Sequence, residues 1–234
     1  MAKHLDLEEQ EQLDELKHFW KNYGNLITWL LILVFGAIAA WNGWQAWQRS
    51  QAAQAAAMNE EVERAVASDD LAKVERAFND MKEKFGRTTY AQQAGLRAAK
   101  VFADKGKPDQ ARAALAWVID KSSDEGYRAT ARLRLAGLLA DAKSYDEALK
   151  QLEGELPADF EPLAADRRGD IYNLQGKKAE AKAQYLKAWA GLDERMDYRK
   201  LVEVKLTALG VDPRPAATAP AAASAASAAS GAKS

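Results

Sequence analysis

Hydrophobic residues divide the chain into two parts with different patterns. Residues 22–48 contain no charged side chain, and their centre reads LITWLLILVFGAIAAW. A run of this length predicts a membrane-spanning helix, because about 20 residues at 1.5 Å each cross a hydrocarbon core of ~30 Å. Beyond the run, apolar residues recur every three or four positions, which predicts helices with one buried face. The first such series is Leu71, Val74, Phe78, Met81 and Phe85.

Aromatic residues flank the apolar run on both sides, as they do at membrane–water interfaces. They are Trp20 and Tyr23 before the run, and Trp41, Trp44 and Trp47 after it. The alternative is a cleaved signal peptide, since residues 37–39 (Ala-Ile-Ala) resemble a cleavage site. Six acids and three lysines precede the run, however, whereas a secretory leader begins with a short basic region. We therefore predict an uncleaved anchor.

Basic residues close to the predicted span set its orientation. Lys17 and Lys21 lie on the N-terminal side, against Arg49 on the other. Because Lys and Arg concentrate on the cytoplasmic side, this bias predicts a cytoplasmic N-terminus and a translocated C-terminal part. Residues 1–21 are then a cytosolic amphipathic segment.

Small residues four apart within the span provide a surface for close helix packing. They are Gly36, Ala39, Ala40 and Gly43. A transmembrane partner on this surface is one interpretation, and ordinary small residues facing lipid are the other.

The part after the membrane, residues 49–210, contains a repeat. Three stretches superpose, GKPDQARAAL, SYDEALKQL and GKKAEAKAQY, with offsets of 37 and 33 residues. In each unit, small and large residues occupy four equivalent positions. The positions hold Ala99, Ala136 and Gly169; Phe102, Leu139 and Tyr172; Ala111, Ala148 and Ala181; and Leu115, Leu152 and Tyr185.

That alternation is typical of tetratricopeptide repeats, in which paired helices approach closely where one offers a small side chain and the other a large one. An ordinary helical bundle is the alternative. The units cover residues 92–125, 129–161 and 162–195, preceded by a partial helix pair and followed by a closing helix, residues 198–209. Residues 211–234, rich in Ala, Ser and Pro, predict a disordered tail. The fold class is all-α, with one N-terminal transmembrane helix before a tetratricopeptide-repeat solenoid.

The composition excludes most catalytic sites. The 33 basic and 34 acidic residues leave no net charge that would favour nucleic acid, and there is no cysteine for a disulfide, thiolate ligand or nucleophile. The two histidines both lie near the N-terminus, which argues against a histidine-centred active site. No two glycines are closer than seven residues, which excludes P-loops and dinucleotide fingerprints. A carboxylate pair, Asp166 and Asp170, is the remaining enzymatic alternative. We predict no catalytic residue, cofactor or metal ion.

The sequence resembles the YfgM family, ancillary subunits of the bacterial Sec translocon. The resemblance rests on the span that ends in WNGWQAW, on YAQQAGLRAAKVFADKG and RATARLRLAGLLADAKSYDEAL, and above all on LAADRRGDIYNLQGKKAEAKAQY. It covers residues 1 to about 210, and the Ala/Ser tail departs from it.

The resemblance implies an inner-membrane protein with a cytoplasmic N-terminus and periplasmic repeats. It implies association with Sec translocon subunits and with a PpiD-like periplasmic chaperone, so that exported chains pass from the channel toward folding. It also implies restraint of an Rcs-type stress-response regulator. A scaffold for cell-envelope or outer-membrane assembly is the alternative function, although such adaptors more often carry a cleaved signal or a lipobox cysteine.

A partner would bind the groove that the first helix of each unit lines. The polar candidates are Lys100, Asp166, Asp170 and Asn173, and Trp189 is a candidate anchor because tryptophan is enriched at hot spots. The alternative is that Asp166 pairs with a neighbouring arginine while Asp170 is solvated. Trp117, followed by Val118 and Ile119, is expected in the core instead.

Overall fold

The computed structural model describes residues 7–154 and 156–213, and in this part of the chain every regular element is a helix. The elements are α1 (Leu7–Ala67), α2 (Leu71–Phe85), α3 (Thr89–Asp104), α4 (Pro108–Lys121), α5 (Glu125–Asp141), α6 (Tyr145–Gln151), the 3₁₀ turn η1 (Ala158–Phe160), α7 (Glu161–Leu174), α8 (Lys178–Gly191) and α9 (Asp197–Ala208). The chain divides into two compact units, and the boundary between Ala57 and Met58 lies within α1. The tail residues 214–234 and residues 1–6 of the cytosolic segment lie outside the described residues.

The first unit contains the predicted membrane span. α1 is the one helix in the described part of the chain that is long and apolar enough to cross a membrane. The large apolar side chains of the span, from Leu26 to Trp47, are mostly exposed in the chain alone, as expected of a surface that faces lipid. Around Gly36 and Gly43, no described atom outside the helix's own backbone lies within 4 Å of the position that a Cβ would take. The predicted packing surface, which also includes Ala39 and Ala40, is therefore open.

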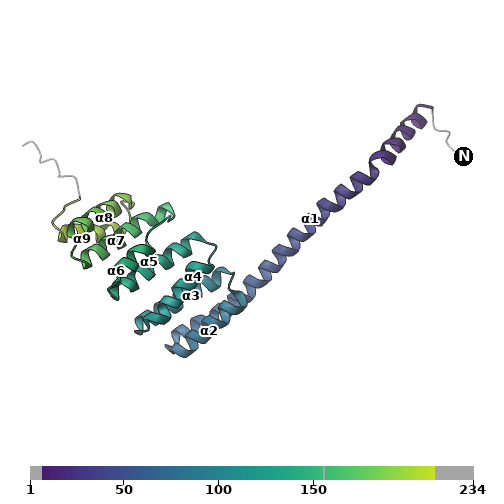
Figure 1. The fold of residues 1–234 in the computed structure, drawn as a ribbon. Helices are drawn as coiled ribbons and strands as arrows, with labels where there is room; N and C mark the ends of the chain where they lie inside the picture. The colour runs from purple at the N-terminus through teal and green to yellow at the C-terminus, as the bar shows by residue number, and fades with distance from the viewer. Residues whose placement is uncertain (1–6, 155, 214–234) are drawn as a thin grey trace, which may run out of the picture. The chain divides into compact units, whose positions relative to one another are not determined.

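The second unit is a stack of helix pairs, and the prediction of a repeat solenoid is confirmed. Helices α3 with α4, α5 with α6 and α7 with α8 form the three predicted units, preceded by α2 and followed by α9 (Figure 1). On α2, Val74, Phe78 and Met81 of the predicted apolar series are buried. Asp70 begins this helix by accepting hydrogen bonds from the backbone N–H groups of the first turn.

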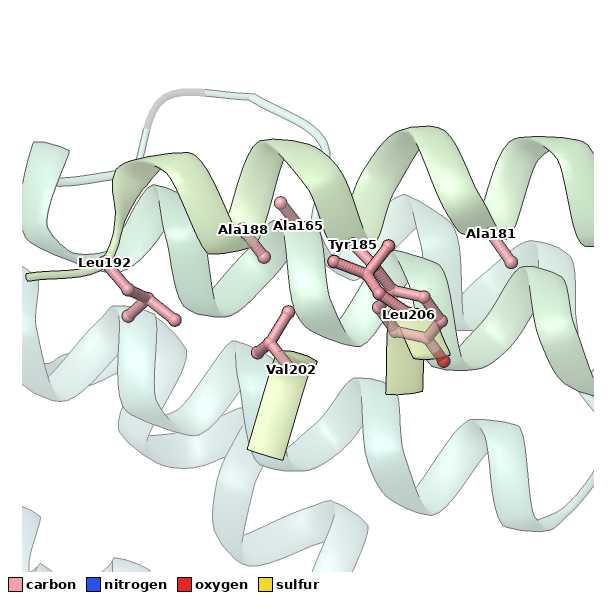
Figure 2. Packing of buried hydrophobic residues seen from close by; sticks show 7 residues of the cluster. All are labelled: Ala165, Ala181, Tyr185, Ala188, Leu192, Val202 and Leu206. Carbon is pink, nitrogen blue, oxygen red and sulfur yellow. The ribbon is translucent and has the colours of Figure 1, made fainter. Parts of the chain in front are cut away.

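Small residues allow the helices of each pair to approach closely. Ala99, Ala136 and Gly169 are all buried, as predicted. At Gly169 the ring of Tyr185 comes within 2.5 Å of the position that a Cβ would take, a distance that no side chain at residue 169 would allow. Tyr185 is 2% exposed and belongs to a core cluster that α8 forms with Ala165 of α7 and with Val202 and Leu206 of α9 (Figure 2).

The same turn follows the first helix of every pair. Its backbone N–H donates to a carbonyl five residues back, on Phe102, Leu139 and Tyr172, at 2.7 to 2.9 Å. The turn after α9 repeats this bond, from Val211 to Leu206 at 3.0 Å, so α9 is built like the first helix of a fourth pair. Three residues before Leu206, however, stands Glu203 in place of the small residue. A charged side chain at this position does not offer the small surface on which the second helix packs in the three repeats.

The second helix of the middle pair is shorter than the repeat predicts. α6 has seven residues, whereas α4 and α8 each have 14. Gly154 adopts a φ of +90°, a positive value that right-handed helices do not contain, and Pro157 follows with φ −52° and ψ 142°, outside the helical region. These two residues explain why the helix ends before the loop that leads to α7.

Candidate partner-binding groove

Three arginines line the surface formed by the first helices of the repeats. Arg97, Arg134 and Arg167 each stand two residues before the small residue of their unit, so they share one register in the stack. Arg97 reaches back to the last part of α1, Arg134 to Leu96 on α3, and Arg167 to Gly137 on α5. We call these three residues the arginine row.

The contacts of the arginine row differ along the stack. Arg97 donates to the Asn59 side chain at 3.0 Å and forms an ion pair with Glu63 at 2.8 Å, both on the last part of α1. Arg134 donates to the backbone carbonyl of Leu96 at 3.0 Å. Arg97 therefore ties α3 to the last part of α1, and Arg134 ties α5 to α3.

Arg167 lies against the helix before its own. Its guanidinium carbon is 3.7 Å from the position that a Cβ at Gly137 would take, which is an ordinary van der Waals distance. Its nearest acid is Asp170, at an N–O distance of 3.7 Å, too long for a hydrogen bond.

The predicted groove carboxylates, Asp166 and Asp170, bind the closing helix. Lys205 of α9 donates to both oxygens of Asp166 at 2.8 Å and to Asp170 at 2.7 Å. Tyr198 donates to Asp166 at 2.6 Å, and Tyr185 donates to Asp170 at 2.8 Å. The Asp166 side chain is 2% exposed. Neither alternative from the sequence describes this arrangement, since a lysine 35 to 39 residues away pairs with both acids.

The two tyrosines are held in their protonated form by this environment. Burial and the hydrogen bond to Asp170 raise the pKa of Tyr185 above its ordinary range. Burial and the hydrogen bond to Asp166 do the same for the pKa of Tyr198. Each phenol therefore remains a hydrogen-bond donor to its carboxylate at neutral pH.

The remaining predicted groove residues occupy different environments. Lys100 is exposed and pairs with Asp104, one turn along α3, at 2.6 Å. Asn173 is exposed near the end of α7. Trp189 is half-buried against the core cluster, with the Arg199 guanidinium 3.9 Å from its ring centroid. Trp117 packs edge-to-face on Phe78, with the two ring centroids 5.5 Å apart, in agreement with the core position expected for Trp117.

Apolar side chains become exposed at one end of the stack. Among the described residues of the repeat unit, every large apolar side chain that is exposed lies at or after Leu174. Two of them, Leu201 and Val204, are 48% and 65% exposed and stand on α9 five and two residues before Leu206. By register, Leu201 occupies the position of the arginine row, so the groove changes from basic to apolar toward its C-terminal end.

The groove has no arrangement suited to acid–base chemistry or metal binding within the described residues. The lysine between Asp166 and Asp170 satisfies both carboxylates, which leaves neither as a free base. No group of three or more His, Asp or Glu side chains is placed to hold a metal ion in residues 7–154 and 156–213.

The arginine row and Lys205 were not predicted from the sequence. The sequence does contain a pattern that could have predicted the arginine row, because an arginine recurs two residues before the small residue in all three units. No sequence pattern marks Lys205, since a single lysine on the closing helix resembles any solvent-exposed charge.

Comparison with known proteins agrees with the fold. The sequence profile of the family described as tetratricopeptide repeat-like domain matches residues 17–211. A protein of Neisseria gonorrhoeae is 33% identical over 217 residues, which cover 89% of this chain and 100% of the relative. A protein of Escherichia coli is 27% identical over 87% of this chain and 97% of its own length, and one of Haemophilus influenzae is 30% identical over 83% and 97%. All three relatives are named ancillary SecYEG translocon subunit. With the fold and the full-length similarity in agreement, this chain belongs to the YfgM family.

Proposed function

We propose that this chain is a non-catalytic, membrane-anchored interaction protein that associates with the Sec translocon in the bacterial inner membrane. The observation that carries the proposal is the similarity to relatives named ancillary SecYEG translocon subunit, which extends over the span and the repeats alike. A single apolar helix and a stack of helical repeats suit such a role, because stacked repeats present extended binding surfaces.

The proposed topology has residues 1–21 in the cytoplasm, residues 22–48 in the membrane and the repeat domain in the periplasm. Lys17 and Lys21 against Arg49 support this orientation. The chain has no cysteine, so single substitutions give an unambiguous test. In intact spheroplasts, a membrane-impermeant maleimide should label Ser123→Cys at once and Asp14→Cys only after lysis. The reverse order would refute the topology.

The proposed partners are Sec translocon subunits in the membrane and a PpiD-like chaperone at the repeats, so that exported chains are handed from the channel to folding factors. Restraint of an Rcs-type regulator is a second role of the same kind. The open surface at Gly36, Ala39, Ala40 and Gly43 is the proposed contact within the bilayer, because small residues let helices approach closely. Lys100 and Asn173 are the exposed polar contacts proposed for the groove.

The experiment is affinity purification of the full-length protein from membranes in mild detergent, with bound proteins identified by mass spectrometry. Recovery of Sec channel subunits together with a periplasmic chaperone is the expected result. Gly36→Leu with Gly43→Leu should reduce the recovery of channel subunits, and Leu33→Ile is the matched control on the same helix. Recovery of envelope-assembly factors without channel subunits would refute the proposal in favour of an assembly scaffold.

A further inference from the structure

Helix α1 carries an apolar face just before it enters the membrane span. Leu13, Leu16, Trp20 and Tyr23 follow one another at intervals of three, four and three residues, which places them on one side of the helix. Their side chains are 40% to 62% exposed in the chain alone. The Phe19 ring lies beside this face, with its centroid 5.1 Å from that of Tyr23. We call the four residues the juxtamembrane face, and their exposure to water favours a contact that buries them.

Charged side chains are distributed unevenly around this part of α1. Lys17 and Lys21 each follow a residue of the juxtamembrane face by one position, so they lie along one of its edges. Lys17 pairs with Asp14 at 3.0 Å, but the two side chains are 75% and 77% exposed, and a pair so exposed is weak. Lys21 has no ion pair with any residue that the structure describes. Glu15 and His18 lie on the side away from the face.

The bilayer is the apolar phase nearest to the juxtamembrane face. The run without charged residues begins at Asn22, so the face ends where the predicted span begins. Helices with aromatic residues and leucine on one side and lysines next to them bind in the headgroup layer, where the apolar side chains reach the acyl chains. Lysine ammonium groups at the edge of such a face extend to the lipid phosphates. Residues 13–23 have this arrangement, and the acids on the other side remain in water.

A straight helix does not bring the whole face to the bilayer. At 1.5 Å per residue, Leu13 lies roughly 18 Å before Asn25, whereas a headgroup layer is only about 5–8 Å thick. In the chain alone α1 continues through Gly24 without a break (Figure 1). Gly24 is nevertheless the weakest point of this region, because glycine favours the helix least of all residues except proline. Its carbonyl also accepts a hydrogen bond from the Thr28 hydroxyl at 2.7 Å, a contact that favours bending.

We propose that α1 bends at Gly24 in the membrane and that the juxtamembrane face lies on the phospholipid surface, with Lys17 and Lys21 bound to headgroup phosphates. The proposal goes beyond the proposed function, because it assigns a lipid contact outside the span and requires no translocon. Interfacial anchors determine the tilt and rotation of a transmembrane helix. The contact therefore sets which side of the span is presented to a partner in the bilayer.

The test is electron paramagnetic resonance on spin-labelled full-length protein in nanodiscs of phosphatidylethanolamine and phosphatidylglycerol. The chain has no cysteine, so a single substitution gives a single label. The label at Leu16→Cys reports the juxtamembrane face, and the label at His18→Cys, two residues away on the other side, is the matched control. The Leu16→Cys label should be several-fold less accessible to a water-soluble nickel complex than the control label, and more accessible to oxygen. Equal accessibility at the two positions would overturn the proposal.

Substitution of the lysines tests the contact with phosphate. Lys17→Glu together with Lys21→Glu should remove most of the difference between the two labels, because carboxylates are repelled by the headgroup phosphates. Lys17→Arg together with Lys21→Arg is the matched control and should retain the difference. If the glutamate variant retains it as well, the lysines do not bind the headgroups.

A comparison of membranes separates lipid from a protein partner. The Leu16→Cys label should be equally shielded in nanodiscs, which contain lipid and this chain alone, and in inner-membrane vesicles. Shielding that is found only in the vesicles would overturn the proposal and assign the juxtamembrane face to a partner protein. Since the nanodiscs contain no translocon, failure of the proposal would leave co-purification with Sec channel subunits unaffected.

Discussion

Replacing Lys205 with methionine should weaken the attachment of the closing helix to the stack. Methionine keeps much of the length and apolar stem of lysine but removes the ammonium that pairs with Asp166 and Asp170. The two carboxylates, 2% and 26% exposed at their side chains, would then lose their shared counter-charge. Removing one partner of a buried ion pair costs about 3–5 kcal/mol.

The remaining hydrogen bonds place this substitution at the lower end of that range. Asp166 keeps the Tyr198 hydroxyl at 2.6 Å, and Asp170 keeps the Tyr185 hydroxyl at 2.8 Å. Lys205 itself is 23% exposed, so water compensates part of the loss. We therefore expect a cost of about 3 kcal/mol, carried mainly by α9 because each element of a repeat stack contacts only its neighbours.

Hydrogen–deuterium exchange of the full-length protein in detergent measures this effect directly. A loss of about 3 kcal/mol should speed exchange of the α9 amides roughly a hundredfold, while those of α3 and α4 change little. Lys200→Met is the control, because its side chain is 77% exposed and its one ion pair, with Asp197, also lies in solvent. If Lys205→Met and Lys200→Met leave α9 equally protected, the buried charge network does not hold the helix in place.

Three further predictions concern packing, pH and the membrane. Gly169→Ala should lower the free energy of unfolding by about 2 kcal/mol in urea denaturation, because the new Cβ would overlap the Tyr185 ring. Gly137→Ala is the control and should be neutral or stabilising, because its Cβ would lie 3.7 Å from the nearest atom, on Arg167. Equal effects would contradict the close approach. Since the pKa of Tyr185 is raised in the folded state, the folded protein keeps its proton more tightly than the unfolded chain, and the free energy of unfolding should fall as pH rises above about 10. Tyr185→Phe should flatten that fall, as followed by circular dichroism, and an unchanged slope would exclude this phenol as its source. Leu31→Lys places a charge in the centre of the span, at a cost of about 3 kcal/mol, and should move protein from the membrane to the soluble fraction, whereas Leu31→Ala should not.

The sequence by itself determined the order of the helices and the class of fold. The span follows from its length and lack of charge, and the repeat follows from small and large residues at fixed intervals, because both are local patterns that hold whatever the rest of the chain does. For the same reason α2 and the closing helix lie within one residue of their expected bounds. α6 is shorter than the repeat predicts because Gly154 and Pro157 follow it closely. The spacing of the repeats takes no account of such helix-breaking residues.

Only the tertiary structure decided which polar residues of the groove are free. Asp166 and Asp170 stand at groove positions in the register, yet Lys205, more than 30 residues away, forms ion pairs with both. The arginine row likewise depends on what lies one repeat earlier, which is Glu63 for Arg97 and a bare carbonyl for Arg134. Side-chain periodicity determines which face a residue lies on, but the partner it meets there depends on how successive repeats are stacked, and that contact is not encoded in any single repeat.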